Sequence, residues 1–98
     1  MDSQIIQICL EMLDARGYTN VKQSTECITA LNTKSQKVYL SIIDHPKLNI
    51  DIIKYYYTFF KDNGYVHGIL VYRNAITSSV KKILEMSYDI KIELFLNS

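Results

Sequence analysis

The chain has 98 residues, 48% of them hydrophobic, with only three glycines and one proline. This length suits one domain with a modest core, and this composition excludes a disordered chain. The formal net charge of +1 excludes the strongly basic class of free-standing nucleic-acid binders, although a light phosphate contact inside a larger assembly is compatible with it.

The cysteines and histidines show no metal-binding or redox spacing. Cys9 and Cys27 form no C-x-x-C motif, and their places in a predicted helix and a predicted strand favour buried, reduced thiols. His45 and His67 match no zinc pattern, so we expect no metal and no other cofactor. The sequence shows no secretory signal and no apolar run of the roughly 20 residues that a membrane span needs, which indicates a soluble intracellular protein.

The first predicted element is an amphipathic helix over residues 2–16. Gly17 is the expected helix stop, and Arg16 is placed to interact favourably with the negative end of the helix dipole. The apolar face consists of Ile5, Ile6, Cys9, Leu10 and Leu13.

Residues 24–31 and 36–43 have the composition of two strands, and the polar segment 32–35 between them predicts a hairpin. Side chains along the second strand point alternately to its two faces. Ser41 is the one polar residue at positions 38–43. A strand that is apolar on both faces is expected near the centre of a sheet.

A second helix is predicted between Asn49, which has N-cap chemistry, and Gly64, with Asp51 in the first turn. Tyr55 and Tyr57 lie on its two flanks. Three consecutive tyrosines on a helix point in different directions, so the run at 55–57 is no base-stacking platform. The inward face consists of Ile52, Ile53, Tyr56, Phe59 and Phe60.

The remaining elements are a strand over 68–73, a helix over about 78–86 and a strand over 89–96. The unbroken apolar run 69–72 is typical of a strand covered on both faces. The third helix should bury Val80 and expose Lys81 and Lys82. In the last strand Ile90, Ile92, Leu94 and Leu96 alternate with polar residues, Phe95 being the exception, and this half-polar alternation predicts an edge strand.

The order of these elements predicts an α/β fold in a single domain spanning 1–98. The last two helices are long enough to connect parallel strands through right-handed crossovers. We therefore expect a small mixed sheet of about four strands, flanked by three helices that cover both of its faces.

The turn from the fifth predicted element into the third helix is the first candidate site. Thr77 has N-cap chemistry, and the backbone N–H groups near Ser78 and Ser79 suit an anion such as a phosphate. Arg73, Lys81 and Lys82 would surround this point. The alternative is an ordinary capped helix with solvated lysines, which spacing alone favours.

Catalysis has little support in the sequence. No Gly-rich phosphate loop, G-x-S-x-G or H-E-x-x-H motif is present. A metal-dependent nuclease needs acids that converge at strand ends with a lysine nearby, and Asp44, Asp89 and Lys91 are the available set. Against this, Asp44 lies beside a turn-forming proline, and Lys91 lies on the solvent face of its strand.

Two blocks resemble the N-terminal jaw domain of the fifth subunit shared by eukaryotic nuclear RNA polymerases. The first, residues 11–18, is similar to that family's E-M-L-x-x-R-G-Y. The second runs from Val38 to Phe95 and contains residues 68–80, which are similar to G-I-x-V-Y-x-N-x-I-T-P-S-A. Together the blocks cover about two-thirds of the chain, and the second block is the more specific.

The resemblance implies a restriction-endonuclease-like fold without catalytic residues, in a non-catalytic subunit domain that contacts the backbone of downstream duplex DNA. The implied partners are other polymerase subunits, especially the largest, downstream DNA and transcription regulators, with no membrane. The implied location is the nucleus, or the host cytoplasm or virion for a viral version. The positions that match the family's DNA-proximal turn are Asn74, Ile76, Thr77, Ser78, Ser79 and Val80.

The chain departs from the family at several points. Ser78 replaces a proline that would pre-set the helix start, and Val80 replaces an alanine. The segment between Tyr18 and Val38 is shorter than in most relatives, and the family's C-terminal assembly domain is absent from this chain. An alternative function is a protein-interaction module that binds another polymerase subunit or a transcription regulator through the exposed face of the third helix.

Overall fold

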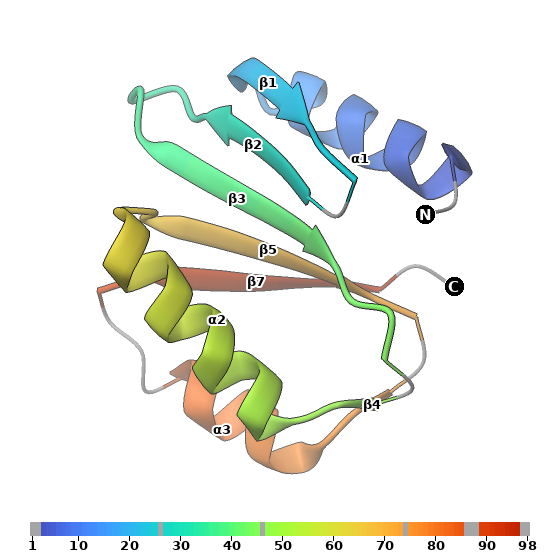
Figure 1. Cartoon of the computed structure of the whole chain (residues 1–98), viewed down its shortest axis with the longest axis vertical. Helices are drawn as coiled ribbons and strands as arrows, with labels where there is room; N and C mark the ends of the chain where they lie inside the picture. The colour runs from blue at the N-terminus through green and yellow to red at the C-terminus, as the bar shows by residue number, and fades with distance from the viewer. Residues whose placement is uncertain (1–2, 26, 46, 74, 86–88, 97–98) are drawn as a thin grey trace.

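The computed structural model describes residues 3–25, 27–45, 47–73, 75–85 and 89–96. A five-stranded mixed sheet lies between helices on both faces (Figure 1). Its strands, in spatial order, are β1 (Thr19–Gln23), β2 (Cys27–Leu31), β3 (Lys37–Ile42), β5 (His67–Tyr72) and β7 (Lys91–Leu96). The helices are α1 (Ser3–Ala15), α2 (Ile50–Asn63) and α3 (Ser78–Glu85). The predicted α/β class with three helices is confirmed.

The connections follow the expected pattern. β1, β2 and β3 pair antiparallel, whereas β3, β5 and β7 pair in parallel, with α2 and α3 as the two crossovers. The register places Val38, His67 and Lys91 side by side at one end of the three parallel strands. The central place of β3 and the edge position of β7 are confirmed. None of the helices in the described ranges is long and apolar enough to cross a membrane.

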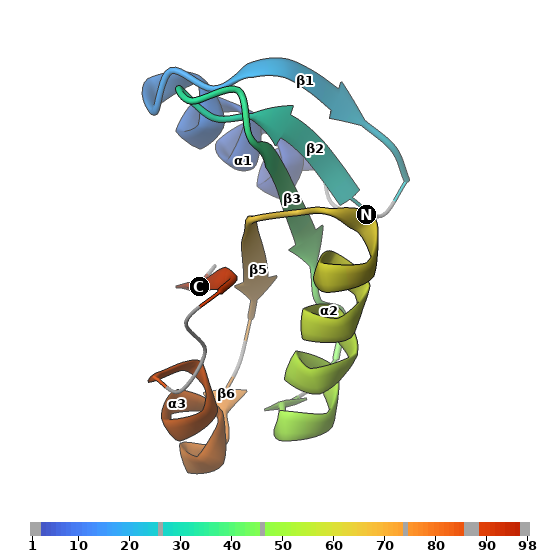
Figure 2. The same cartoon turned by 90° about the vertical axis from the view of Figure 1, so that its left-hand side faces the viewer.

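Each face of the sheet has its own apolar core. Figure 2 shows the helices that cover them, with α1 on one side of the strands and α2 on the other. On one face, α1 covers β2, β3 and β5, and the buried residues there are Ile5, Cys9, Leu13, Ile28, Ala30, Val38, Leu40, Ile69 and Val71. On the other face, α2 and α3 cover β3, β5 and β7, and the buried residues are Ile43, Leu48, Ile53, Phe60, Leu70, Val80 and Ile90. β5 contributes to both cores, as its unbroken apolar run predicted.

The helix ends are set by the residues expected from the sequence. Gly17 adopts a left-handed φ of +77° after α1, and the Tyr18 N–H donates to the Leu13 carbonyl at 3.1 Å. The Asn49 side chain accepts a hydrogen bond from the Ile52 N–H at 3.1 Å. Gly64 ends α2 with a left-handed φ of +75°. These local bonds replace the ones that helix termini lack.

Ser41 and the two cysteines are small side chains in or near the cores. Ser41 is only 3% exposed in the centre of the sheet, and its hydroxyl lies 2.8 Å from the Tyr56 hydroxyl on α2. Cys9 is fully buried, which raises its pKa, while Cys27 is half-buried; both are free thiols. The prediction of two buried thiols is therefore right for Cys9 and overstated for Cys27.

The predicted start of one strand was wrong, and three strands were not predicted. The strand expected to begin at residue 24 begins at Cys27, because the Ser24 N–H bonds the Cys27 carbonyl at 2.9 Å in a turn. β1 was not predicted because all five of its residues are exposed and show no apolar alternation. The two-residue strands β4 (Lys47–Leu48) and β6 (Ala75–Ile76), which pair in parallel, were also missed.

Candidate nucleic-acid interface

The turn that leads into α3 is held in place by backbone pairing with β4. β6 pairs with β4 so that Lys47 lies beside Ala75 and Leu48 beside Ile76. The Thr77 N–H then donates to the Leu48 carbonyl at 3.1 Å. Leu48 is 1% exposed within the α2–α3 core, so it anchors this backbone to the interior. The helix start is consequently held in one place relative to the sheet.

The predicted contact residues separate into an exposed and an inward-facing set. Ser78, Ser79, Lys81 and Lys82 are exposed, and so is Arg73, which directly follows β5. The described first turn of α3, residues 78–81, contains no acidic residue that would offset the positive end of the helix dipole. The exposed set therefore presents hydroxyl groups, two ammonium groups and first-turn N–H groups to solvent.

The inward-facing set corrects part of the predicted site. Val80 is 0% exposed in the core under the turn, so its side chain cannot touch a nucleic acid. Ile76 is half-buried against the same core. These two side chains position the turn, because apolar side chains of this size are stabilised by burial. Asn74 lies outside the described residues.

Thr77 differs from the expected N-cap in its hydrogen bonds. Its hydroxyl lies 3.1 Å from the Ser79 hydroxyl, and its carbonyl accepts from the Val80 N–H at 3.1 Å. Because the Thr77 N–H already bonds Leu48, that N–H is unavailable to an anion. The candidate backbone donors are thus those of Ser78 and Ser79.

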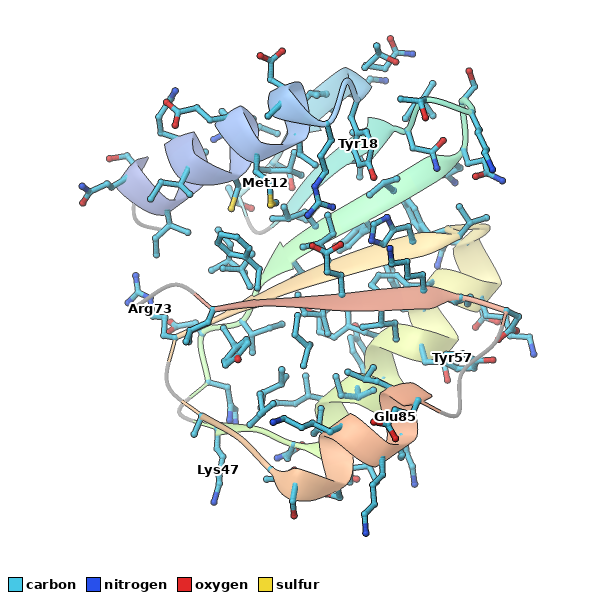
Figure 3. The ribbon with its side chains drawn as sticks, turned by 180° about the vertical axis from the view of Figure 1, so that it is seen from behind. Met12, Tyr18, Lys47, Tyr57, Arg73 and Glu85 are labelled. Carbon is cyan, nitrogen blue, oxygen red and sulfur yellow. The ribbon has the colours of Figure 1, made fainter. Side chains whose placement is uncertain are left out.

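Lys47 is a cation at this site that the sequence analysis did not include. It is exposed, and the β4–β6 pairing places it next to Ala75, shortly before α3. Figure 3 shows Lys47 and Arg73 both pointing outward on the side of the molecule where β4 and β6 lie. Lys47 and Ala75 are separated by 27 residues of chain, so this proximity is visible only from the β4–β6 pairing.

The nuclease set does not converge. Asp44 follows the carboxyl end of β3, whereas Asp89 and Lys91 lie at the amino end of β7. Because β3, β5 and β7 are parallel, these are opposite ends of the sheet. The register levels of Lys91 and Ile42 alone are about 13 Å apart along the strands. Asp44 and Asp89 therefore cannot hold one metal ion together.

Asp89 has a different partner. Its carboxylate accepts a hydrogen bond from the Tyr57 hydroxyl at 2.7 Å, which connects α2 to the approach of β7. This bond lowers the pKa of Asp89 and raises the pKa of Tyr57. Within the described ranges, no three His, Cys, Asp or Glu side chains gather in a way that would hold a metal ion.

A second polar cluster joins α1 to the edge strand. The guanidinium of Arg16 donates two hydrogen bonds to the Glu93 carboxylate, one of them at 3.0 Å. His67 Nε2 lies 3.3 Å from Glu93 Oε1, but without hydrogen-bond geometry. Glu93 is half-buried, although it lies on an edge strand. Arg16 was expected to interact with the helix dipole. It forms an ion pair with a residue 77 positions away in the sequence.

The ionisation of this cluster follows from its contacts. Hydrogen bonds from Arg16 hold the pKa of Glu93 below its ordinary value of 4.5, and they raise the pKa of Arg16. Burial lowers the pKa of His67 below its ordinary value of 6.5, although the charge of Glu93 opposes this. The cluster is therefore an ionised Arg–Glu pair beside a neutral imidazole, and it supports structure on the face away from α3.

Comparison with known proteins places the fold. No protein-family model and no curated protein sequence matches the chain. Among solved structures, EndoMS in its apo form matches 100% of this chain with a TM-score of 0.61 and 15% sequence identity. EndoMS has the restriction-endonuclease-like fold. This chain has a restriction-endonuclease-like fold. It spans 47% of the EndoMS chain, and at this identity the likeness extends to the fold alone.

Proposed function

We propose that this chain is a non-catalytic domain of a DNA-directed RNA polymerase that contacts the backbone of downstream duplex DNA. The resemblance of residues 68–80 to the jaw-domain turn motivates the proposal. The main supporting observation is the exposed start of α3, where Ser78 and Ser79 lie in sequence between the exposed Arg73 and Lys81 and directly follow Thr77, which is bonded to β4. Phosphate contacts of this kind position a protein on DNA without selecting a base sequence.

The arrangement suits guidance more than tight binding. Among the described residues, four exposed cations lie in or next to the segments that form the turn, namely Lys47, Arg73, Lys81 and Lys82. A net charge of +1 means that the rest of the surface adds no attraction for DNA. The isolated chain should therefore bind duplex DNA weakly, and the contact gains strength when the polymerase holds both partners in place. A nuclease has no comparable support, since its acids lie at opposite ends of the sheet.

Replacing Lys47, Lys81 and Lys82 together by glutamate should lower the affinity for a 20-base-pair duplex about tenfold at low salt. Each lost phosphate contact should also reduce the slope of log affinity against log salt by about 1. The measurement is a fluorescence anisotropy titration at several salt concentrations, with backbone-amide chemical shifts to locate the contact. The substituted side chains are exposed, so the fold should be retained.

The matched control replaces Lys22, Lys34 and Lys54 by glutamate, which makes the same charge change at exposed positions in β1, the hairpin and α2. This variant should lose clearly less affinity. Equal losses in the two variants would mean that DNA senses only the net charge, and the proposed contact at the α3 turn would be wrong.

A further inference from the structure

The outer flank of α2 presents an aromatic ridge with a hollow on each side. Tyr55 is 65% exposed, the largest exposed fraction among the large hydrophobic side chains described. An open hollow of about 480 Å³ lies between Tyr55 and the end of β3, and another of about 540 Å³ lies between Tyr55 and the carboxyl half of α2. Both hollows share Asp51 and Tyr55 in their linings, so they form one strip along the helix.

One neighbouring side chain supports Tyr55. The Tyr55 ring packs edge-on against Tyr56, with ring centroids 5.2 Å apart. Tyr56 in turn is fixed by the hydrogen bond between its hydroxyl and that of Ser41. Exposed tyrosines are enriched among the residues that dominate protein interfaces, so Tyr55 is the natural anchor of a contact on this strip.

The hollows are apolar at the base and acidic at the rim. Half-buried Ile52 lines the first hollow and half-buried Phe59 the second, two helical turns and about 10 Å apart along the axis. Exposed carboxylates border them: Asp44 and Asp51 line the first, Asp51 and Asp62 the second. Lys54 is the one lysine or arginine in the two linings, and the His45 ring is bonded to the Lys47 backbone.

The charge of the strip decides which class of partner fits it. Three carboxylates against one ammonium repel the phosphates of a nucleic acid, in contrast to the cationic turn before α3. The apolar floor and the exposed Tyr55 ring favour aliphatic or aromatic side chains. Exposed ion pairs add little affinity, but they exclude partners of the wrong charge.

We propose that this strip along α2 binds a basic segment of a partner protein. The segment places apolar side chains in the hollows on both sides of Tyr55 and places Lys or Arg side chains beside Asp44, Asp51 and Asp62. This surface is independent of the DNA contact proposed above. Each of the two contacts can be lost without the other.

The test is selection of binding peptides from a random 12-residue phage library against the whole chain. Peptides that bind should have a net positive charge and at least two apolar residues. Their affinity should fall at least tenfold in Tyr55→Ala and several-fold in the double variant Asp51→Asn with Asp62→Asn. Duplex DNA should not displace them, and their chemical-shift changes should map to α2.

The matched control is Glu11→Gln with Asp14→Asn, which removes two exposed carboxylates from α1 on the other face of the sheet. It should leave peptide binding unchanged. Selected peptides without excess basic charge, or peptides that bind Tyr55→Ala as well as they bind the wild type, would overturn the proposal. So would equal losses in the two carboxylate variants, because the recognition would then be of overall charge.

Discussion

Replacing Gly68 by alanine is expected to lower the free energy of unfolding by about 3 kcal/mol, at the upper end of the usual cost of overpacking a core. A Cβ at this position would lie 2.0 Å from Phe60 Cε2 and 2.4 Å from Phe60 Cζ. Phe60 is 0% exposed, and its ring is in contact with those of Tyr39, Tyr56 and Tyr65. The ring therefore cannot move without displacing the aromatic cluster between α2 and the sheet.

Urea denaturation of the variant and the wild type measures this change. Gly64→Ala is the control, because a Cβ there meets nothing within 4 Å and only the left-handed φ of +75° is unfavourable. It should cost about 1 kcal/mol. Combining Gly68→Ala with Phe60→Leu should cost at least 1 kcal/mol less than the sum of the two single changes. Simple additivity, or a Gly68→Ala variant as stable as the wild type, would show that Phe60 does not occupy this place.

The second large effect is expected at the cluster of Arg16, Glu93 and His67. Glu93→Gln should lower the free energy of unfolding at pH 7 by about 2 kcal/mol, because the half-buried Arg16 loses a bidentate carboxylate partner. Arg16→Gln should have a similar effect, and the double variant should cost less than the sum, since both changes remove the same contact. Urea denaturation of all three variants tests this, and fully additive losses would contradict it.

The same cluster predicts how stability depends on pH. His67 has a lowered pKa in the folded state, so below about pH 6.5 the unfolded chain binds a proton that the folded chain does not. The contribution of His67 to the free energy of unfolding is therefore fully present above the ordinary histidine pKa, and it is lost as the pH falls below that value. Glu93, whose pKa is also lowered, adds a further loss below about pH 4.5.

Denaturation midpoints measured between pH 7.5 and pH 5 test the histidine contribution. His67→Gln should flatten the loss of stability over this range, whereas His45→Gln, which removes an exposed histidine, should retain it. A wild-type midpoint that does not change between pH 7.5 and pH 5 would contradict the assignment to His67.

Most of the fold was predictable because its signals are local. Asn49, Gly17 and Gly64 determine helix ends through bonds within a few residues, and the apolar run of β5 reports burial on both faces. β1 escaped prediction because an exposed edge strand needs only backbone pairing, so its side chains show no pattern. Its irregular register and the positive φ of Asn20 weaken the signal further.

The candidate site was predictable only in part, because some of its contacts join segments that are far apart in the sequence. Lysines 81 and 82 lie on the helix that the sequence identifies, so their exposure followed from its periodicity. Lys47 and the ion pair between Arg16 and Glu93 depend on contacts between distant segments. Val80 was predicted in two ways, as a core residue of the third helix and as a position of the DNA-proximal turn. The structure supports its place in the core.

The parallel pairing of β3 with β5 and of β5 with β7 has a consequence for how the chain reaches its native state. Each pairing joins strands separated by a whole crossover helix, so much chain entropy is lost before the ladders form. The β2–β3 hairpin and the helices, by contrast, close over short distances in sequence. Mixed α/β topologies of this kind have an intermediate contact order, so they fold more slowly than helical bundles. Until β5 joins the sheet, the side chains that later fill both cores remain exposed to water and to other chains.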